Sequence, residues 1–589
     1  MLEIKKDGYV FDLYPGTVIS MEITNTALDD DIVNGSYSFP FKIPLTPWNR
    51  SMLNFPDEIA GIVSIQVSVS VEVWVDGLLL FPNATFNLKG TNRTYVNAYL
   101  LVGVSTFAAY ADSNKLKDKM DYILNFDQSL GDAGDLKLHA KNTLTGSVDT
   151  APYVFPTMVN NDHYQNEMQK SENAYTKDVV YNFYANNSFQ LTDQVVVSDQ
   201  TTEAGLKHGK LTMVPFIYAT YILRKILAPL NLTTNVFETD PELKKLILSN
   251  NFSLDKWYPI YTQYFINRNN RPIDLKNHVP DMKIGEFLVA LKKVFCLYLY
   301  KDPFDDKIHF DAFKNLINDP EYVDWTSIAL ADYSMEETLA KGVKYLPDLA
   351  DRVLSGTGTM LGVNRKPAVQ REVNLPNSGN SIGDVRMVEE TGRLYSWQYV
   401  FLFSTWLPYT SALGDYYGNP SAYELKNSLP GVVTSKYQFY PSHLYQYPID
   451  YFVPAVGFPG SYQGSDNKEV TSSIISRLLF YRGMKTSSGG HAYPFASSHN
   501  YDMAKNRVGN YSLAWDGTDG LYNVWWKDYI RMKDNTKQVS REVMLSLLAL
   551  LNLNLRKKVR IGDTNFLIRK ISLQLPLVKP AKVEFWKIT

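Results

Sequence analysis

The eight histidines are the side chains best suited to bind a metal ion, but their spacing is not that of a metal site. No two stand four residues apart and none belongs to a His-Glu-x-x-His pattern, so the sequence offers no zinc hydrolase site. His491 and His499 share a loop rich in glycine and serine at residues 487–500, which could present both to a metal ion or a sugar. We expect ordinary polar loop residues, the more frequent outcome.

Two acidic runs could offer oxygen ligands to calcium. One is the triplet Asp29, Asp30 and Asp31, and the other is the run from Asp516 to Gly520. The second resembles part of an EF-hand loop, but Lys527 stands where the twelfth-position glutamate should be. We therefore expect turns with solvated carboxylates. A carboxylate pair for glycoside cleavage cannot be located from the sequence, because 61 acidic residues guarantee some close pair.

The sequence also offers no motif for nucleophilic catalysis or for phosphate binding. The glycine-rich run at residues 355–359 lacks the lysine and the following helix of a P-loop. No Gly-x-Ser-x-Gly pattern occurs, and the single cysteine, Cys296, lies in an apolar run that predicts burial. We therefore assign no catalytic, cofactor-binding or metal-binding residue and no cofactor, and we expect a protein that is not an enzyme.

Composition narrows the class of protein further. With 589 residues the chain exceeds one hydrophobic core, which predicts several domains. Its 59 basic and 61 acidic residues are scattered, so we expect no sequence-specific binding of nucleic acid. One cysteine indicates synthesis in a reducing cytoplasm. Because no apolar run approaches the ~20 residues of a membrane helix, we expect neither secretion nor membrane insertion.

The elements that would position any site are mainly strands. From Val63 to Val75, valine or isoleucine alternates with mostly polar residues, which predicts a long half-buried strand. Asp76-Gly77 predicts a tight turn, residues 78–88 a returning strand, and residues 95–102 a third strand after a turn at 90–92. Ile19, Met21 and Ile23 alternate in the same way, so the first hundred residues resemble one small barrel or sandwich.

Helical spacing predicts helices at about residues 106–120, 214–230 and 282–295. A further helix should begin at Asp240 as N-cap with Pro241 in its first turn and continue through Ile247. The helix at 282–295 should lead into a hairpin of residues 297–300 and 307–310. Near the end of the chain we expect strands at 474–481 and 541–547, a helix at 521–532, and a hairpin of 559–561 and 566–575 around Gly562.

The predicted fold class is mainly β with α+β insertions, multidomain, with small antiparallel β-barrel or sandwich domains at both ends and a helix-hairpin module. The expected segments are an N-terminal β-barrel or meander domain at 1–120, a loop-rich β region at 121–213, the α+β helix-hairpin module at 214–320, an irregular aromatic-rich β region at 321–480, and a C-terminal β domain with one helix at 481–589.

Several phrases resemble the tail hub or baseplate proteins of phages and prophages of gut Bacteroidetes. They cover about half of the chain; residues 330–470 lie outside the resemblance. They are Tyr37 to Leu45, Val73 to Gly77 with Leu80-Phe81, Ile222 to Ile226, Asp240 to Leu246, Leu521 to Lys527, and Lys557 to Gly562 with Phe566 to Ile568.

The resemblance implies a virion structural protein of the phage tail, made in the host cytoplasm. Its β domains would form a homo-oligomeric ring, a trimer in most such proteins, joining the tail tube to the spike or fibre apparatus. The partners would be copies of itself and other tail proteins: tube, spike, fibre or distal tail proteins. The alternative is a carbohydrate-binding, adhesin-like protein that stacks sugars on aromatic residues between 330 and 510, or less readily a glycan-degrading enzyme.

Overall fold

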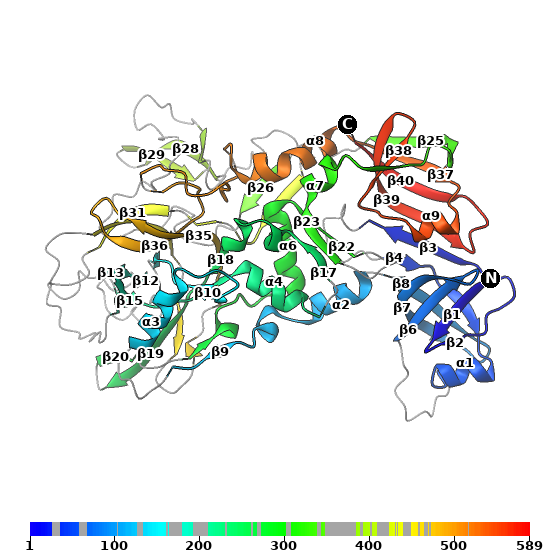
Figure 1. Cartoon of the computed structure of the whole chain (residues 1–589), viewed down its shortest axis with the longest axis horizontal. Coiled ribbons are helices and arrows are strands. Elements are labelled where there is room, and N and C mark those ends of the chain that lie inside the picture. The colour runs from blue at the N-terminus through cyan, green and yellow to red at the C-terminus, as the bar shows by residue number, and fades with distance from the viewer. Residues whose placement is uncertain are drawn as a thin grey trace.

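The chain folds into a mainly β structure of several antiparallel sheets, seen in a computed structural model, as its fold class predicts. Figure 1 shows an elongated molecule with a large sheet at one end and a mixed body at the other. The structure describes all residues except 26–35, 58–67, 103, 127–133, 161–162, 164–178, 192–209, 230–231, 261–262, 268–271, 302–307, 338–342, 348–384, 389–392, 401–402, 409–422, 430, 433, 440–448, 458–459, 464–468, 471–472, 503, 516 and 589.

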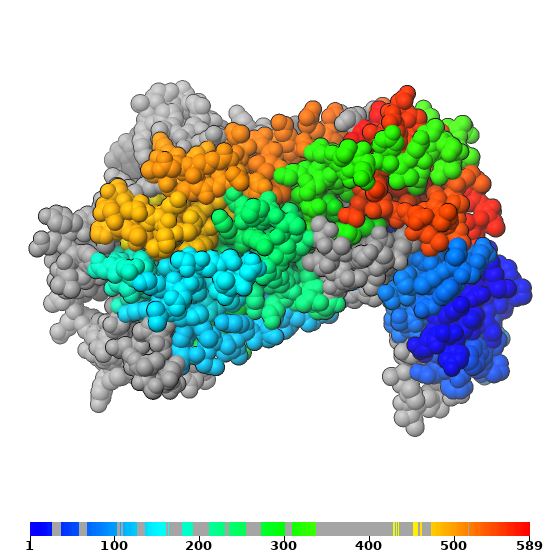
Figure 2. Space-filling model, viewed as in Figure 1, coloured from blue at the N-terminus to red at the C-terminus, as the bar shows by residue number. Residues whose placement is uncertain are grey.

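The two ends of the chain meet in one fourteen-stranded sheet, here called the terminal sheet. Strand β3 (Ile19–Thr24) pairs antiparallel with β39 (Thr564–Leu575) along its whole length. Just beyond β3, the buried Asn25 side chain donates hydrogen bonds to the carbonyls of Leu555 and Ile568 at 2.9 and 2.8 Å. Figure 2 shows the blue N-terminal and red C-terminal segments packed together.

The path through the terminal sheet is β2 (Tyr9–Val10), β1 (Leu2–Lys6), β6 (Ser68–Val75), β7 (Leu78–Thr91), β8 (Tyr95–Val102), β4 (Ser36–Ser38), β3, β39, β40 (Ala581–Ile588), β37 (Lys537–Val543) and β25 (Ala329–Glu337). Off this path, β5 (Phe41–Pro44) pairs with β8, and β38 (Lys558–Ile561) pairs with both β39 and β24 (Tyr322–Asp324). Among the described strands this sheet is open, so the closed barrels expected at the chain ends are not found there.

The predicted N-terminal meander is present. In β6 the valines at 69, 71, 73 and 75 are buried while the residues between them are more exposed, and the predicted extension over 63–67 lies outside the described residues. Asp76 and Gly77 have φ values of 50° and 79°, which the tight turn requires. Strand β7 runs three residues further than predicted, because the second turn is closed at Asn92, whose side chain accepts from the Tyr95 N–H at 2.8 Å.

The C-terminal hairpin around Gly562, whose φ is 61°, is also confirmed as β38 and β39. The strand predicted at 541–547 is shifted: β37 ends at Val543, and helix α9 (Leu547–Leu551) follows. The Ser546 hydroxyl accepts from the Ala549 N–H at 3.1 Å, so a capped helix begins where the strand was expected to continue.

The body contains the predicted helix-hairpin module. Helix α6 (Ile284–Phe295) ends at Cys296, which is buried as predicted and adopts a left-handed φ of 45°. Strands β22 (Leu297–Lys301) and β23 (Ile308–Ala312) follow as an antiparallel hairpin. The left-handed residue ends the helix and turns the chain into the first strand.

Two helices predicted before α6 in the same module are wrong in part. Residues 214–230 begin as strand β16 (Phe216–Tyr218) and only then form α4 (Ala219–Leu227). The predicted cap at Asp240 is real, since its carboxylate accepts from the backbone N–H groups of Glu242 and Leu243. It caps only a 3-10 turn, however, and the chain continues as the fully buried strand β18 (Leu246–Ser249) between β16 and β35 (Arg477–Thr486). Sheet pairing overrides the helical pattern.

Other boundaries differ as well. The helix expected at 106–120 divides into α2 (Val104–Ser113) and a 3-10 turn, Leu116–Lys119. The region read as short strands and loops contains helix α3 (Gly134–Thr143). The strand expected at 474–481 is β35, which begins and ends later. The helix at 521–532 is confirmed, as a π-helical turn, Tyr522–Trp526, followed by α8 (Lys527–Asn535).

The main sheets of the body are β10 (Tyr153–Val154), β16, β18, β35 and β36 (Ala492–Ser497); β15 (Lys210–Thr212), β12 (Val179–Tyr181), β11 (Met158–Asn160), β32 (Ile449–Val456) and β31 (Thr434–Phe439); and β17 (Leu232–Asn235), β23 and β22. The remaining elements are α1 (Pro47–Met52), α5 (Val236–Thr239), α7 (Phe313–Asn318), β9 (Ile123–Leu124), β13 (Tyr184–Ala185), β14 (Ser188–Phe189), β19 (Phe252–Ile260), β20 (Gln263–Asn267), β21 (Ile273–Asp274), β26 (Val343–Pro347), β27 (Val385–Val388), β28 (Arg393–Val400), β29 (Phe403–Pro408), β30 (Tyr423–Asn427), β33 (Ser461–Gln463) and β34 (Glu469–Val470). Within the described part of the chain, no helix has the length and apolar character needed to cross a bilayer.

Candidate functional site

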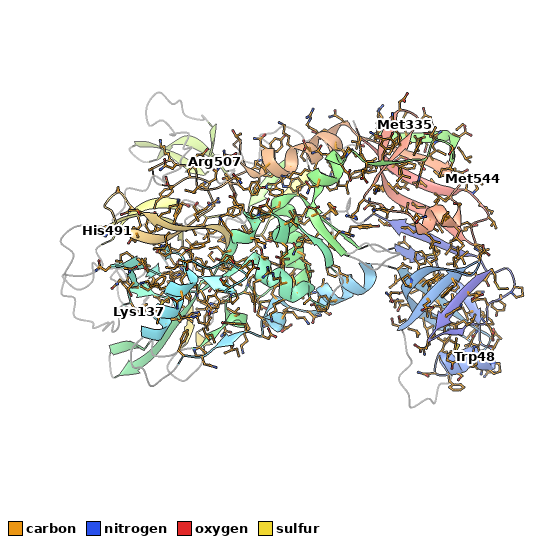
Figure 3. The ribbon with its side chains drawn as sticks, in the orientation of Figure 1. Trp48, Lys137, Met335, His491, Arg507 and Met544 are labelled. Carbon is orange, nitrogen blue, oxygen red and sulfur yellow. The ribbon has the colours of Figure 1, made fainter. Side chains whose placement is uncertain are left out.

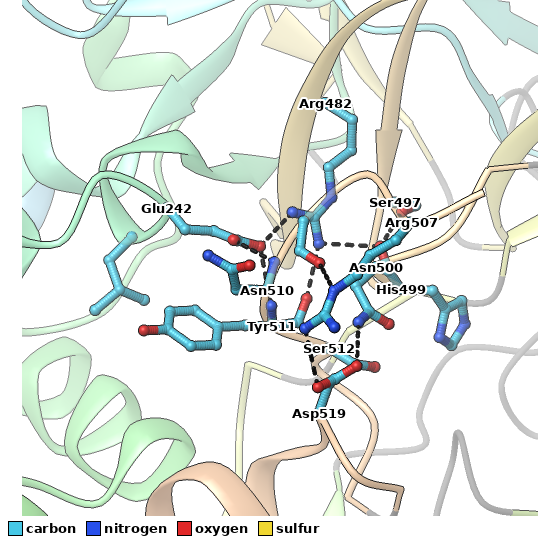
Figure 4. Close-up of polar contacts among 12 residues, drawn as sticks. Glu242, Arg482, Ser497, His499, Asn500, Arg507, Asn510, Tyr511, Ser512 and Asp519 are labelled. Atoms are coloured by element: carbon cyan, nitrogen blue, oxygen red, sulfur yellow. Dashed lines mark hydrogen bonds and ion pairs between the residues drawn. The ribbon is translucent and has the colours of Figure 1, made fainter.

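A dense polar network in the body lies where residues 498–520, here called the network loop, meet β35 and the turn before β18 (Figure 4). Its centre is the ion pair between Arg482 and Glu242, whose side chains are only 1% and 8% exposed. The partners are 240 residues apart in sequence, and the pairing of β18 with β35 brings them together.

Arg482 points into the network because β35 is irregular at this position. Tyr481 pairs with Ala496 of β36, and Gly483 pairs with Phe495, so Arg482 is an extra residue in its strand. Such a bulge turns a side chain away from the regular alternation. Gly483 has a φ of 79°, a conformation that glycine adopts without strain.

The Glu242 carboxylate accepts several donors at once: the Arg482 guanidinium and the backbone N–H groups of Asn510 and Tyr511, the latter at 3.0 Å. Gly509 leaves the room for this contact. A Cβ atom there would overlap the paired Arg482 and Glu242 atoms and would lie 2.7 Å from Arg482 Cζ. The loop backbone therefore packs directly against the ion pair.

Arg482 in turn holds the loop through its second terminal nitrogen. Nη2 donates to the carbonyls of His499 at 3.0 Å and Tyr511 at 2.8 Å. Burial lowers the pKa of the Arg482 guanidinium, and Glu242 opposes this effect. The carboxylate compensates the buried charge and the two carbonyls accept from Nη2, whereas the buried Nε forms no hydrogen bond within the described part of the chain.

The outer part of the loop is closed by Asp519. Its two carboxylate oxygens accept from Asn500 Nδ2 at 2.7 Å and from Arg507 Nη2 at 3.1 Å. This aspartate belongs to the run at 516–520 that we considered for calcium, and Asp516 itself lies outside the described residues. In this structure Asp519 bonds to loop residues and is largely covered, so the expected solvated turn is only partly correct.

The two histidines considered together are separated by the structure. His491 precedes β36 and His499 follows it, and a six-residue strand places them roughly 20 Å apart. His491 lies at the outer end of the body (Figure 3), whereas His499 is buried in the network. Burial, with a smaller effect of the Arg482 charge, lowers the pKa of His499 to about 4. His499 is therefore neutral near pH 7.

Tyr511 connects the loop to the helices beside the terminal sheet. Its hydroxyl donates to Asp240 Oδ2 at 2.6 Å, and burial and this hydrogen bond raise the pKa of the phenol. Its ring lies edge-on to Trp525 with centroids 5.1 Å apart, and the Lys314 ammonium lies 4.1 Å from the centre of a Trp525 ring. Burial lowers the pKa of Lys314. The network thus joins β35 to helix α7 and to the π-helical turn that precedes α8.

The other candidates add no site. The triplet Asp29 to Asp31 and the run at 355–359 lie outside the described residues. The described residues hold no cluster of three or more His, Cys, Asp or Glu suited to a metal ion. Asp240 and Glu242 both accept hydrogen bonds from donors within this chain.

The aromatic side chains considered as sugar platforms are mostly interior where they are described. Between 330 and 510 the exposed one is Tyr333, at 59%. Tyr451 and Tyr493 stack with ring centroids 4.1 Å apart inside a buried cluster with Phe183 and Phe495, where they cannot meet a sugar. The buried aromatic residues in this range are Tyr451, Phe452, Phe480, Tyr481, Tyr493 and Phe495.

The exposed aromatic residues gather instead on the terminal sheet and its connections. All eight of the described exposed aromatic side chains lie in residues 9–55 and 322–333, whereas the described body exposes only Ile123, Leu138 and Met484 among its large hydrophobic residues. Figure 3 shows Met335 and Met544 at one end of the terminal sheet and Trp48 at the other end. The eight are Tyr9, Tyr14, Tyr37, Phe39, Trp48, Phe55, Tyr322 and Tyr333.

Sequence reasoning missed both features. Glu242 and Arg482 stand in unremarkable local sequence, and nothing but the sheet pairing reveals that they meet. The 40 tyrosines suit protein interfaces and sugar-binding grooves alike, and composition does not say which of them are exposed.

Comparison with solved structures finds distant neighbours, among them a prophage tail protein. No protein-family model matches the chain, and no curated protein matches it. The crystal structure of the 43 kDa tail protein of prophage MuSo2 from Shewanella oneidensis aligns over 99% of this chain and 97% of that one, with 6% sequence identity and a TM-score of 0.30. A TM-score of that size does not establish a shared fold.

Proposed function

We propose that this chain is a structural subunit of a phage tail, without catalytic activity, that belongs to the hub or baseplate. Its copies form a ring that connects the tail tube to the spike or fibre apparatus, and other tail proteins bind above and below it. The sequence phrases that resemble tail hub proteins, from Tyr37 to Leu45 through Phe566 to Ile568, support this assignment.

The observation that carries the proposal is the placement of all eight described exposed aromatic side chains on the terminal sheet and its connections. Aromatic residues are enriched where proteins bind one another, because they bury a large area with few rotatable bonds. Tyr9 and Trp48, 60% and 44% exposed, contact each other edge-on with centroids 5.7 Å apart. A surface of this kind at one end of an elongated subunit favours a role in assembly.

The polar network favours the same role. Glu242 and Asp519 both accept donors from the network loop. The network ties the loop to the strands and helices beside it.

The test is the state of association of the purified protein. Multi-angle light scattering should give a closed oligomer, and negative-stain electron microscopy should show a ring. Combining Tyr9→Ala with Trp48→Ala should shift the protein towards monomer, whereas Leu138→Ala, which truncates a 59% exposed residue of the body, should not. A stable monomer at tens of micromolar, with no dependence on these residues, would contradict the proposal.

A further inference from the structure

Strand β25 leaves one edge of the terminal sheet open. It is the last strand of the sheet and pairs, among the described strands, only with β37. Every residue from Leu330 to Glu336 is exposed. Because a strand donates and accepts on both sides, the groups of β25 that point away from β37 can pair with another chain.

On one face of this edge, the row of apolar side chains that is buried on β37 and β40 continues onto β25. Met335 lies opposite Val539 of β37, and Val539 lies opposite Phe585 of β40, so the three share one face of the sheet. Val539 and Phe585 are buried, whereas Met335 is 52% exposed, as is Tyr333 at 59% two residues before it. The apolar face therefore ends uncovered.

The other face of the edge is acidic. Ser334 and Glu336 alternate with the apolar residues, and Asp332 precedes them next to an irregularity in the pairing. Neither Asp332 nor Glu336 forms a hydrogen bond or ion pair with another described side chain. The edge thus carries apolar and acidic side chains in alternation.

The opposite edge of the sheet is protected. Strand β2 has two residues, and Trp48 Nε1 donates to the Val10 carbonyl at 2.9 Å, which occupies part of that edge. Short, covered edges are how proteins avoid pairing with other chains. The length, exposure and side-chain pattern of β25 contrast with this protection.

We propose that β25 binds, by strand addition, an extended segment of a different protein in which apolar and basic residues alternate. This proposal rests on the proposed function, because the bound segment would belong to a neighbouring subunit of the same assembly. A second copy of β25 is a poor partner, because antiparallel pairing centred on Ser334 would set Asp332 against Glu336 and oppose like charges. A basic strand would instead place Lys or Arg beside Glu336 and apolar side chains over Met335.

The test uses the full-length protein and synthetic nine-residue peptides in which valine alternates with lysine or with glutamate. Fluorescence anisotropy should show binding of the valine-lysine peptide, and hydrogen exchange should show protection of residues 329–337 on addition of that peptide. Glu336→Lys should weaken its binding about tenfold, since a cross-strand attraction becomes a repulsion. The same variant should strengthen binding of the valine-glutamate peptide.

The matched control is Asp563→Lys, a charge reversal at a fully exposed turn of the same sheet, which should leave peptide binding unchanged. Equal binding of both peptides, or no protection of 329–337 at millimolar peptide, would overturn the proposal. Protection of 329–337 by self-association alone would assign the edge to a second copy and overturn the stated partner. If the protein forms a ring but binds no peptide, only this inference is refuted. If a monomeric protein binds the peptide, only the proposed ring is refuted.

Discussion

Replacing Glu242 with glutamine should detach the network loop from β35. Glutamine keeps the shape of the side chain but removes its charge, and its NH2 group replaces one of the two oxygens that accept from Arg482, Asn510 and Tyr511. Arg482 would remain 1% exposed without a counter-charge. Breaking a buried ion pair from one side typically costs about 3 to 5 kcal/mol, most of it the penalty of the uncompensated charge.

The suitable assay is amide hydrogen exchange followed by mass spectrometry, because a chain of several domains does not unfold in a single transition. If the cost appears as local opening, the amides of residues 498–513 should exchange roughly 150-fold to 5,000-fold faster than in the wild type. The remaining core strands should keep their rates.

Glu238→Gln is the matched control. Glu238 also binds an arginine, Arg224, but both side chains are about a third exposed, so the loss should be at most about 1 kcal/mol. Replacing both buried partners, by Glu242→Leu together with Arg482→Met, leaves no unpaired charge but removes the hydrogen bonds to the loop backbone, so loop exchange should stay faster than in the wild type. If loop exchange in Glu242→Gln stays within threefold of the wild type, the ion pair does not hold the loop and the reasoning fails.

Three further predictions concern single positions. Gly509→Ala should destabilise the loop by about 1 to 3 kcal/mol, because the added methyl group overlaps the ion pair; a loop exchange rate equal to that of the wild type would contradict this. The pKa of His499 is about 4 in the folded chain against 6.5 when exposed, so the unfolded chain binds the proton more tightly. The free energy of unfolding should therefore fall by about 3 kcal/mol as the pH drops from about 6.5 to 4. His499→Gln should lose this part of the pH dependence in denaturant titrations, and an unchanged pH dependence would contradict the prediction. Asn25→Ala removes two buried donors that join the chain ends, so it should lower the free energy of unfolding by about 1 to 3 kcal/mol. Amide exchange in β3 and β39 should become faster, and unchanged exchange in these strands would contradict the prediction.

Secondary-structure elements were predicted correctly where a single local sequence pattern was enough to define them. The alternation in β6, the turns at Gly77 and Gly562, and the spacing in α6 all gave correct elements, since each depends on neighbours within a few residues. Residues 240–247 show the limit of this reasoning: the cap at Asp240 was correct, but β18 follows because its four buried residues pair with strands on both sides.

The sequence by itself determined that the chain is β-rich and that its cysteine is buried. Tertiary structure alone decided that β3 pairs with β39, that a bulge directs Arg482 towards Glu242, and that β25 ends the sheet with its outer edge open. The physical reason is distance along the chain. Patterns of two or 3.6 residues record which face of an element is buried, whereas partners hundreds of residues apart leave no periodic trace in either segment.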